Sequence, residues 1–235
     1  MLSAARAAAE PARRHFIASL SRLEGMPADL VHLVRHGEVH NPERVLYGRL
    51  EGYRLSDLGQ RMAKAAVATL AGHPVTALRA SPLQRTQESA APWAEAFGLD
   101  VTLDERLIEP TNRFEGRRMD GRTLAHPRSW PLLVNPRKPS WGEAFVDVAA
   151  RMLMAMADAR ESVDSGEVVL VSHQLPIWMV HRATAGLPLH HDPRRRRCAL
   201  SSVTSFAWND GAFSEIGYQE PGADLLASST DLGAV

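Results

Sequence analysis

The chain has 235 residues, 45% of them apolar, and its 27 Lys and Arg are balanced by 27 Asp and Glu, so we expect a globular protein with a full core. A formal charge of zero argues against a nucleic-acid-binding protein, which needs an excess of Lys and Arg for its phosphate contacts. The single Cys198 excludes an internal disulfide, and no apolar run is long enough to cross a membrane, which favours a cytoplasmic protein.

The two ends of the chain differ from its middle. Residues 1–25 are rich in Ala and Arg and lack the continuous apolar stretch of a secretory signal, so we predict a peripheral or disordered extension. Residues 220–235 show no hydrophobic periodicity, which predicts a flexible tail in solvent. One domain is therefore expected to span residues 26–219.

Strands and helices alternate through this domain. Short β-branched or apolar runs predict strands at 31–34, 75–80, 99–103, 167–172, 203–208 and 213–218. Apolar residues at helical spacing predict helices at 57–70, from 82 onward, at 143–161 and at 176–185. Such alternation is typical of an α/β fold, and we expect a three-layer α/β/α sandwich with a mostly parallel central sheet. Reactive groups should then lie beyond the carboxyl ends of the strands.

The helix after the second strand has a marked start. Ser81 is placed as its N-cap and Pro82 at its first helical position. Pro92 should kink or interrupt the same helix.

Three strand ends carry groups that suit a phosphoryl group. The first strand ends in Arg35, His36 and Gly37; Arg85 lies in the first turn of the helix after the second strand; His173 follows a later strand. If these strands are neighbours, two guanidinium groups and two imidazoles converge. Arginine binds phosphate oxygens bidentately, and a helix N-terminus favours an anion. A neutral imidazole held through one ring nitrogen can attack phosphorus with the other, and Gly37 permits the tight turn that this needs.

Four segments, in this order, resemble the motifs of the histidine phosphatase superfamily, also called phosphoglycerate mutase-like, over roughly residues 29–218. They are Arg35-His36-Gly37-Glu38, Ser81-Pro82-Leu83-Gln84-Arg85-Thr86, Leu107-Ile108-Glu109 and Ser172-His173. The resemblance implies a phosphoglycerate mutase-like fold in which His36 is phosphorylated and Arg35, Arg85 and His173 bind the transferred group. It also implies that Glu109 protonates the leaving oxygen and later activates water. This chemistry requires no metal ion and no cofactor.

Further residues are predicted to contact the substrate. Gly37 lies beside the nucleophile, and Gln174 stands where members of the family usually have Gly, which adds an amide beside the phosphate. Asn41 is one residue closer to His36 than the family's usual phosphate-contacting Asn. Arg113, in the stretch after Glu109, is placed to meet the rest of the substrate.

Other interpretations of the same residues fit less well. His36 and His40 flank Glu38, but a zinc-protease pattern needs Glu at a different position and a helix rather than a strand end. No Gly-x-Ser-x-Gly elbow is present for a serine hydrolase. The run Arg194–Arg197 is interpreted as a solvated loop face.

We therefore predict a metal-independent phosphate monoester hydrolase that acts on a small phosphorylated metabolite through phosphohistidine. Two alternatives stay open: a phosphoglycerate mutase-type phosphotransferase, and a catalytically idle phosphoester-binding module. Residues 110–141 match the mutases poorly, which favours hydrolysis. The sequence does not fix the oligomeric state, and a homodimer stays open.

Overall fold

The computed structural model of the chain describes residues 27–132, 134–135 and 139–231. Within these residues, a sheet of six strands has the order β3-β2-β4-β1-β5-β6. The strands are β1 (Leu30–Arg35), β2 (Val75–Ala80), β3 (Val101–Leu103), β4 (Glu167–Ser172), β5 (Val203–Asn209) and β6 (Ala212–Gln219). The first four strands pair in parallel, whereas β5 pairs antiparallel with both β1 and β6. The predicted α/β fold with a mostly parallel sheet is confirmed.

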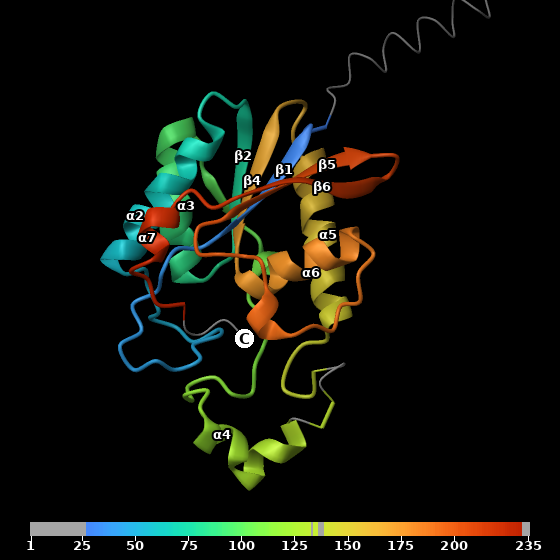
Figure 1. Cartoon of the computed structure of the whole chain (residues 1–235). Coiled ribbons are helices and arrows are strands. Elements are labelled where there is room, and N and C mark those ends of the chain that lie inside the picture. The colour runs from blue at the N-terminus through green and yellow to red at the C-terminus, as the bar shows by residue number, and fades with distance from the viewer. Residues whose placement is uncertain (1–26, 133, 136–138, 232–235) are drawn as a thin grey trace, which may run out of the picture.

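Helices cover both faces of the sheet (Figure 1). One face carries α2 (Asp57–Val67) and α3 (Gln84–Phe97), and the other carries α5 (Phe145–Glu161) and α6 (Gln174–Thr184). Successive residues of a strand point to opposite faces, so Leu33 of β1 packs in the core under α5 and α6, while Val34 packs in the core under α2 and α3. The three-layer sandwich expected from the sequence is therefore present.

Ser56 is the N-cap of α2. Its Oγ accepts a hydrogen bond from the Gly59 N–H at 2.9 Å, and Asp57 lies in the first turn. The 3₁₀ turn η1 (Ala68–Leu70) extends this helix to the end of the predicted segment. The first turn of α2 is thus fixed, and it faces the loop that follows β1.

The start of α3 differs from the prediction. The helix begins at Gln84 with Leu83 as its N-cap, and Ser81 and Pro82 form the turn that precedes it. Ser81 Oγ lies 3.5 Å from the Leu83 N–H but only 2.8 Å from Nε2 of His173. The hydroxyl is therefore used across strands instead of as a helix cap.

Pro92 neither ends nor interrupts α3, which continues to Phe97. The ring of Trp93 is buried and stacks on that of Phe97, with the centroids 6.1 Å apart. Packing of this second half against the sheet outweighs the hydrogen bond that proline cannot make.

Two segments lie outside the sandwich. Between the 3₁₀ turn η2 (Glu105–Leu107) and α5, the chain extends beyond the carboxyl ends of the parallel strands and carries α4 (Gly121–Ala125) and η3 (Pro127–Leu132) (Figure 1). Residues 220–231 fold back over the domain through α7 (Ala223–Leu226), which differs from the expected tail in solvent. The extension predicted for residues 1–25 lies outside the described residues. No helix in the described part of the chain is long and apolar enough to cross a bilayer.

Candidate active site

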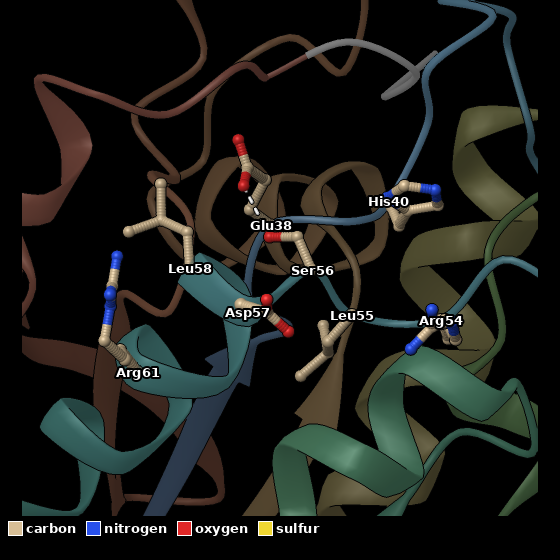
Figure 2. A pocket seen from close by; sticks show the side chains of 8 residues that line it. All are labelled: Glu38, His40, Arg54, Leu55, Ser56, Asp57, Leu58 and Arg61. Atoms are coloured by element: carbon tan, nitrogen blue, oxygen red, sulfur yellow. Dashed lines mark hydrogen bonds between the residues drawn. The ribbon is translucent and has the colours of Figure 1, made fainter.

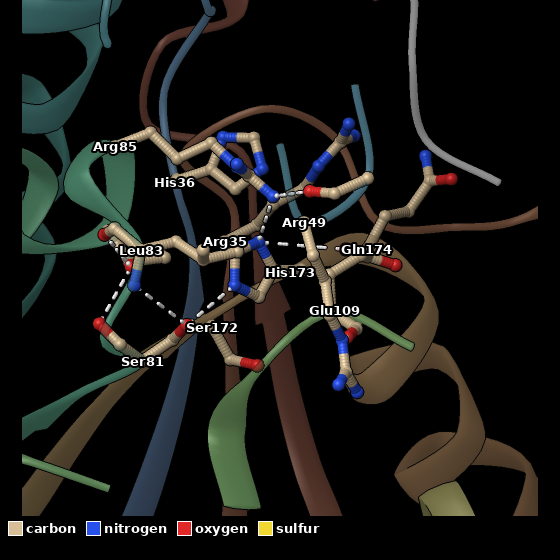
Figure 3. A network of polar contacts seen from close by, with 12 residues as sticks. Arg35, His36, Arg49, Ser81, Leu83, Arg85, Glu109, Ser172, His173 and Gln174 are labelled. Atoms are coloured by element: carbon tan, nitrogen blue, oxygen red, sulfur yellow. Dashed lines mark hydrogen bonds and ion pairs between the residues drawn. The ribbon is translucent and has the colours of Figure 1, made fainter. Parts of the chain in front are cut away.

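Groups from three strand ends meet at one edge of the sheet. In the sheet, β4 lies between β1 and β2. His36 directly follows β1, Ser81 follows β2 and His173 follows β4, and Figure 3 shows the side chains of Arg85 and Glu109 in the same cluster. The ring centroids of His36 and His173 are 5.2 Å apart. The structure thus brings the two imidazoles together, as expected if the three strands are neighbours.

His36 is oriented by the carbonyl of the next residue. Its Nδ1 lies 2.7 Å from the Gly37 oxygen, and because a carbonyl only accepts, Nδ1 carries the proton. Among the described residues, Nε2 has no hydrogen-bond partner. Burial, reinforced by Arg85 and Arg35, lowers the pKa of His36 well below 6.5. The ring is therefore neutral at pH 7, with a lone pair on Nε2.

Gly37 supports His36, although not for the predicted reason. Its φ lies outside the left-handed region, so the tight turn does not require glycine. A Cβ at this position would instead lie 2.4 Å from the Gly59 carbonyl oxygen of α2. Its N–H donates to Ser89 Oγ at 3.1 Å and its carbonyl accepts from His36. Both backbone groups position the ring.

Arg85 is buried in the first turn of α3 and is held from two sides. Its Nη2 donates to the Gly48 carbonyl at 2.7 Å and to His173 Nδ1 at 3.3 Å, and its guanidinium lies 4.8 Å from the ring centroid of Tyr47. Gly48 has φ +42°, and a Cβ there would lie 2.1 Å from Glu115 Oε1. A glycine at this position therefore lets the chain present its carbonyl to Arg85.

His173 has the opposite tautomer to His36. Because Arg85 can only donate, Nδ1 of His173 accepts, and its Nε2–H donates to Ser81 Oγ at 2.8 Å. Burial, with Arg85 and His36, lowers the pKa of His173 well below 6.5. A dianion beside the ring would raise that pKa and allow Nδ1–H to donate to it.

Arg35 is fully buried, and its fork is engaged by the C-terminal segment. Nη1 donates to the Cys198 carbonyl at 2.6 Å, and both Nη atoms donate to the Asp231 carboxylate at 2.7 and 2.5 Å. Burial alone would lower the pKa of Arg35, but Asp231 outweighs it and raises the pKa. The Nε–H groups of Arg35 and Arg85 are buried with no acceptor in the described part of the chain. A cluster with surplus buried donors suits an anion.

Glu109 supplies a carboxyl group to the same cluster. Its backbone carbonyl accepts from Arg49 Nε at 2.5 Å, and its Oε2 lies 3.5 Å from Nδ1 of His173. Oε1 is buried and has no hydrogen-bond partner among the described residues. Burial raises the pKa of Glu109, against the effects of Arg85 and Arg196. A carboxyl group that keeps its proton to higher pH is suited to general acid catalysis.

The structure places the other predicted contact residues, Gln174, Asn41 and Arg113, in different surroundings. The Gln174 amide donates to the Cys198 carbonyl at 3.4 Å, the same oxygen that Arg35 uses. The Asn41 side chain bonds to both backbone groups of Val45, at 2.8 and 3.2 Å, and closes the loop after β1. Arg113 is exposed in the outer segment, and with the described residues its side chain forms no hydrogen bond or ion pair. Roles in substrate binding for Asn41 and Arg113 stay predictions.

Two functional candidates were missed by sequence reasoning. The interpretation of Arg194–Arg197 as a solvated face is right for Arg194 and Arg195, which are exposed, and wrong for Arg196, whose Nε donates to His191 Nε2 at 2.8 Å. Asp231 is 196 residues from the arginine it binds. Neither contact has a local sequence signal, because each joins segments that meet only in the folded chain.

A hollow of about 550 Å³ includes in its lining Glu38, which is two residues after His36 in the chain (Figure 2). It is lined by residues of the loop after β1 and of the start of α2, and Arg54, Asp57 and Arg61 bring charges of both signs to it. Glu38 accepts from Ser56 Oγ at 2.5 Å and from the Thr230 N–H at 2.7 Å. One carboxylate thus connects the loop after β1, the start of α2 and the C-terminal segment.

Comparisons with known proteins agree with this geometry. The family model "Histidine phosphatase superfamily (branch 1)" matches residues 31–220. The chain is 50% identical over 196 residues to the Mycobacterium tuberculosis "Uncharacterized protein Rv0525" (82% of this chain, 96% of that one). It is 32% identical over 181 residues to a "Probable phosphoglycerate mutase GpmB" of Enterobacter sp. (74% and 83%). The solved structure of mycobacterial glucosyl-3-phosphoglycerate phosphatase Rv2419c superposes with a TM-score of 0.66 at 26% identity (80% and 97%). The chain belongs to the histidine phosphatase superfamily.

Proposed function

We propose that the chain is a phosphate monoester hydrolase that acts on a small phosphorylated metabolite through a phosphohistidine on His36. The observation that carries this proposal is the orientation of the His36 ring. Its Nδ1–H donates to the Gly37 carbonyl at 2.7 Å, so the Nε2 lone pair points away from that hydrogen bond. The ring centroid of His36 lies 5.2 Å from that of His173. The phosphatases and mutases among the similar proteins support the reaction class. The cytoplasmic location expected from the sequence stays a prediction.

The first step transfers the phosphoryl group to the protein. Nε2 of His36 attacks phosphorus as the bond from phosphorus to the leaving oxygen breaks. The Glu109 carboxyl group gives its proton to that oxygen, so an alcohol leaves and a carboxylate remains. The raised pKa of Glu109 supports this role.

The second step returns the protein to its starting state. Water attacks the phosphohistidine, the Glu109 carboxylate takes one proton from the water, and the bond from nitrogen to phosphorus breaks. Inorganic phosphate leaves, His36 is again neutral and Glu109 is again protonated. The same carboxyl group therefore acts as acid and then as base.

Arg35, Arg85 and His173 stabilise the charge on the transferred group in both steps. Their donors lie in a buried site, where a charge-assisted hydrogen bond is stronger than in water. Arg35 can take this role only when its fork is released from Asp231. Loss of one such donor is expected to cost about 10²–10³ in kcat.

The test is the variant His36→Ala, assayed with 4-nitrophenyl phosphate. We expect turnover to be abolished while the thermal unfolding temperature changes little, because the ring makes its one hydrogen bond within its own loop. Rapid quenching of the wild type with ³²P-labelled substrate should yield acid-labile label that is absent from His36→Ala. Near-normal turnover by the variant, or acid-stable label, would remove the proposal. Activity is expected to persist in chelator.

A mutase is the second candidate, because relatives 32% identical carry the name "Probable phosphoglycerate mutase". In a mutase the phosphohistidine passes its group to a second hydroxyl of a bound sugar acid instead of to water. Rates of phosphate release and of isomerisation, measured on phosphoglycerate with and without bisphosphoglycerate, discriminate the two. Isomerisation faster than release would favour the mutase.

A further inference from the structure

One arginine of the basic run turns toward the active site. Arg194 and Arg195 are exposed in the loop between α6 and β5, and Arg194 pairs with Asp192 at 2.8 Å. Arg196 is half-buried, and its Nε and Nη1 donate to His191 Nε2 at 2.8 Å and to Gln174 Oε1 at 3.3 Å. The Arg196 guanidinium is therefore held by His191 and by Gln174, the residue after His173.

The acceptor on His191 is fixed. Its Nδ1–H donates to the Leu189 carbonyl at 2.9 Å, which leaves Nε2 to accept from Arg196. Burial lowers the pKa of His191 to about 4, so the ring stays neutral at pH 7 and does not repel the guanidinium. The rings of Phe145 and Trp178 pack beside it, at centroid distances of 5.4 and 6.1 Å. Arg196 thus has a preorganised position.

Gln174 connects Arg196 to the phosphoryl site. Its Oε1 accepts from Arg196, and its Nε2 donates to the Cys198 carbonyl, which also accepts from Arg35 Nη1 at 2.6 Å. One side chain, that of Gln174, and one carbonyl, that of Cys198, therefore separate Arg196 from the Arg35 guanidinium at the end of β1. Figure 3 shows Gln174 in the same view as Arg35, His173 and Glu109.

The guanidinium of Arg196 has hydrogen-bonding capacity left over. Of its five N–H groups, the described residues accept from one on Nε and one on Nη1. Three donors remain, next to a site where two other arginines already bind the transferred group in the proposed mechanism. A positive charge with unused donors at this position selects for a second negative charge.

We propose that Arg196, positioned by His191 and Gln174, binds a carboxylate on the part of the substrate that leaves, so that the substrate is a phosphorylated carboxylic acid. This inference rests on the proposed hydrolase activity. A carboxylate matches the planar fork of a guanidinium, whereas a neutral leaving group would form no charge-assisted hydrogen bond with it.

The alternative role for Arg196 is to act through Glu109. The Arg196 guanidinium and the Glu109 carboxyl group lie close enough for each to shift the pKa of the other. A residue that only adjusts Glu109 would change the rate on every substrate by the same factor. A specificity residue would change the rate only on substrates that carry the carboxylate.

The experiment compares phenyl phosphate with 2-, 3- and 4-carboxyphenyl phosphate on the wild type, Arg196→Ala and Arg195→Ala. For at least one carboxylated ester we expect Arg196→Ala to lower kcat/KM about 10- to 100-fold, mainly through KM, the range typical of a charge-assisted hydrogen bond. The wild type and Arg196→Ala should hydrolyse phenyl phosphate with almost equal kcat/KM. Arg195→Ala removes an exposed charge from the same loop and should behave as wild type on all four esters.

Three outcomes would overturn the proposal that Arg196 binds a substrate carboxylate. They are an equal loss on all four esters, no loss on any, or the same selective loss in Arg195→Ala. A wild type that does not hydrolyse phenyl phosphate would instead remove the proposed function. Calorimetric binding of phenylphosphonate and 3-carboxyphenylphosphonate makes the comparison without turnover, and thermal unfolding of each variant verifies its fold. Gln174→Gly, which frees one side of Arg196, should give a smaller selective loss than Arg196→Ala.

Discussion

Burial gives Glu109 and His36 opposite ionisation behaviour at a single site. It raises the pKa of the Glu109 carboxyl group, which keeps its proton to higher pH, and it lowers the pKa of His36, which stays neutral to lower pH. The proposed first step needs a neutral imidazole and a protonated carboxyl group at the same time. Ordinary pKa values of 6.5 and 4.5 would leave little overlap between the two forms, and both shifts increase that overlap.

We predict that Glu109→Gln lowers kcat/KM for an alkyl phosphate by about 10²–10⁴, the usual contribution of general acid catalysis. The loss should be smaller for 4-nitrophenyl phosphate, because its leaving group departs without a proton. On the alkyl ester, the wild-type rate should fall as pH rises through the pKa of Glu109, and this fall should be absent from the variant. Steady-state profiles for both esters measure this, and equal losses with unchanged profiles would exclude Glu109 as the acid.

At this scale, the sequence predicts the residues that carry a local signal. Arg35 and His36 follow a buried strand, and Arg85 lies one residue into a helix, so their positions follow from neighbouring residues alone. Arg196 and Asp231 have no such signal. Whether an arginine in a basic run faces solvent or a neighbouring loop depends on the packing of segments that are distant in the chain.

At the scale of elements, α2 and the loop after β1 touch backbone to backbone. A Cβ on Gly37 would lie 2.4 Å from the Gly59 carbonyl oxygen, and a Cβ on Gly59 would lie 2.0 Å from the carbonyl oxygen of Glu38. The two glycines therefore allow the helix to hold the residues that orient His36. Neither contact can be relieved by a change of rotamer, because both partners are backbone atoms.

The variant Gly59→Ala tests this contact. Alanine gains about 1 kcal/mol of helix propensity over glycine, but overpacking typically costs about 1–3 kcal/mol, and a rigid backbone partner favours the upper end. We expect a lower free energy of unfolding and a fall in kcat larger than the change in KM, since the Gly37 carbonyl moves. Gly217→Ala is the control, because a Cβ there meets nothing within 4 Å. Wild-type kcat in Gly59→Ala would show that the contact is dispensable.

The strands were predictable and the details of α3 were not. Each predicted strand exists because β-branched and apolar runs fit a buried sheet whatever their partners. The start of α3 depends on Ser81, whose hydroxyl is used by His173 instead of by the helix. Its continuation past Pro92 depends on the burial of Trp93, which only the tertiary structure provides.

For the molecule as a whole, three buried histidines make stability depend on pH. His36 and His173 lie in the active site, and His32 links strands through Glu167 Oε2 at 2.9 Å and Ser205 Oγ at 2.8 Å. Burial lowers the pKa of all three below the ordinary value of 6.5, so the folded state binds fewer protons than the unfolded chain on the acid side of that value. Stability is then lost as pH falls through and below 6.5.

We expect the free energy of unfolding, measured in urea, to be nearly constant above pH 7.5 and to fall below pH 6.5. Each such histidine contributes up to about 1.4 kcal/mol per pH unit. Glu109 acts in the opposite direction, because its raised pKa makes the folded state bind more protons, but it is one group against these three histidines and His191, whose pKa burial lowers to about 4. His173→Asn should reduce the slope of the free energy of unfolding against pH by the amount that corresponds to about one bound proton. A slope that does not change would show that His173 is not neutral in the folded protein.

The C-terminal segment contacts the active site through the carboxylate of Asp231. Asp231 binds both Nη atoms of Arg35, and the Thr230 N–H donates to Glu38 Oε1 at 2.7 Å. In the proposed mechanism, a carboxylate on that fork occupies donors that the transferred phosphoryl group needs. We therefore expect substrate and Asp231 to compete for Arg35, so that the affinity for phosphate falls as the fraction of molecules with an engaged fork rises.

Asp231→Asn should tighten the binding of inorganic phosphate. The Asp231 side chain is 38% exposed, so its ion pair is worth about 1 kcal/mol after screening by solvent, which corresponds to an increase in affinity of about fivefold. Isothermal titration with phosphate, and its Ki against 4-nitrophenyl phosphate, measure the effect at low salt and at 0.5 M salt, where the difference should shrink. Asp224→Asn removes an exposed charge from the same segment and is the matched control. Weaker binding of phosphate by Asp231→Asn would mean that the carboxylate positions Arg35 for the substrate instead of competing with it.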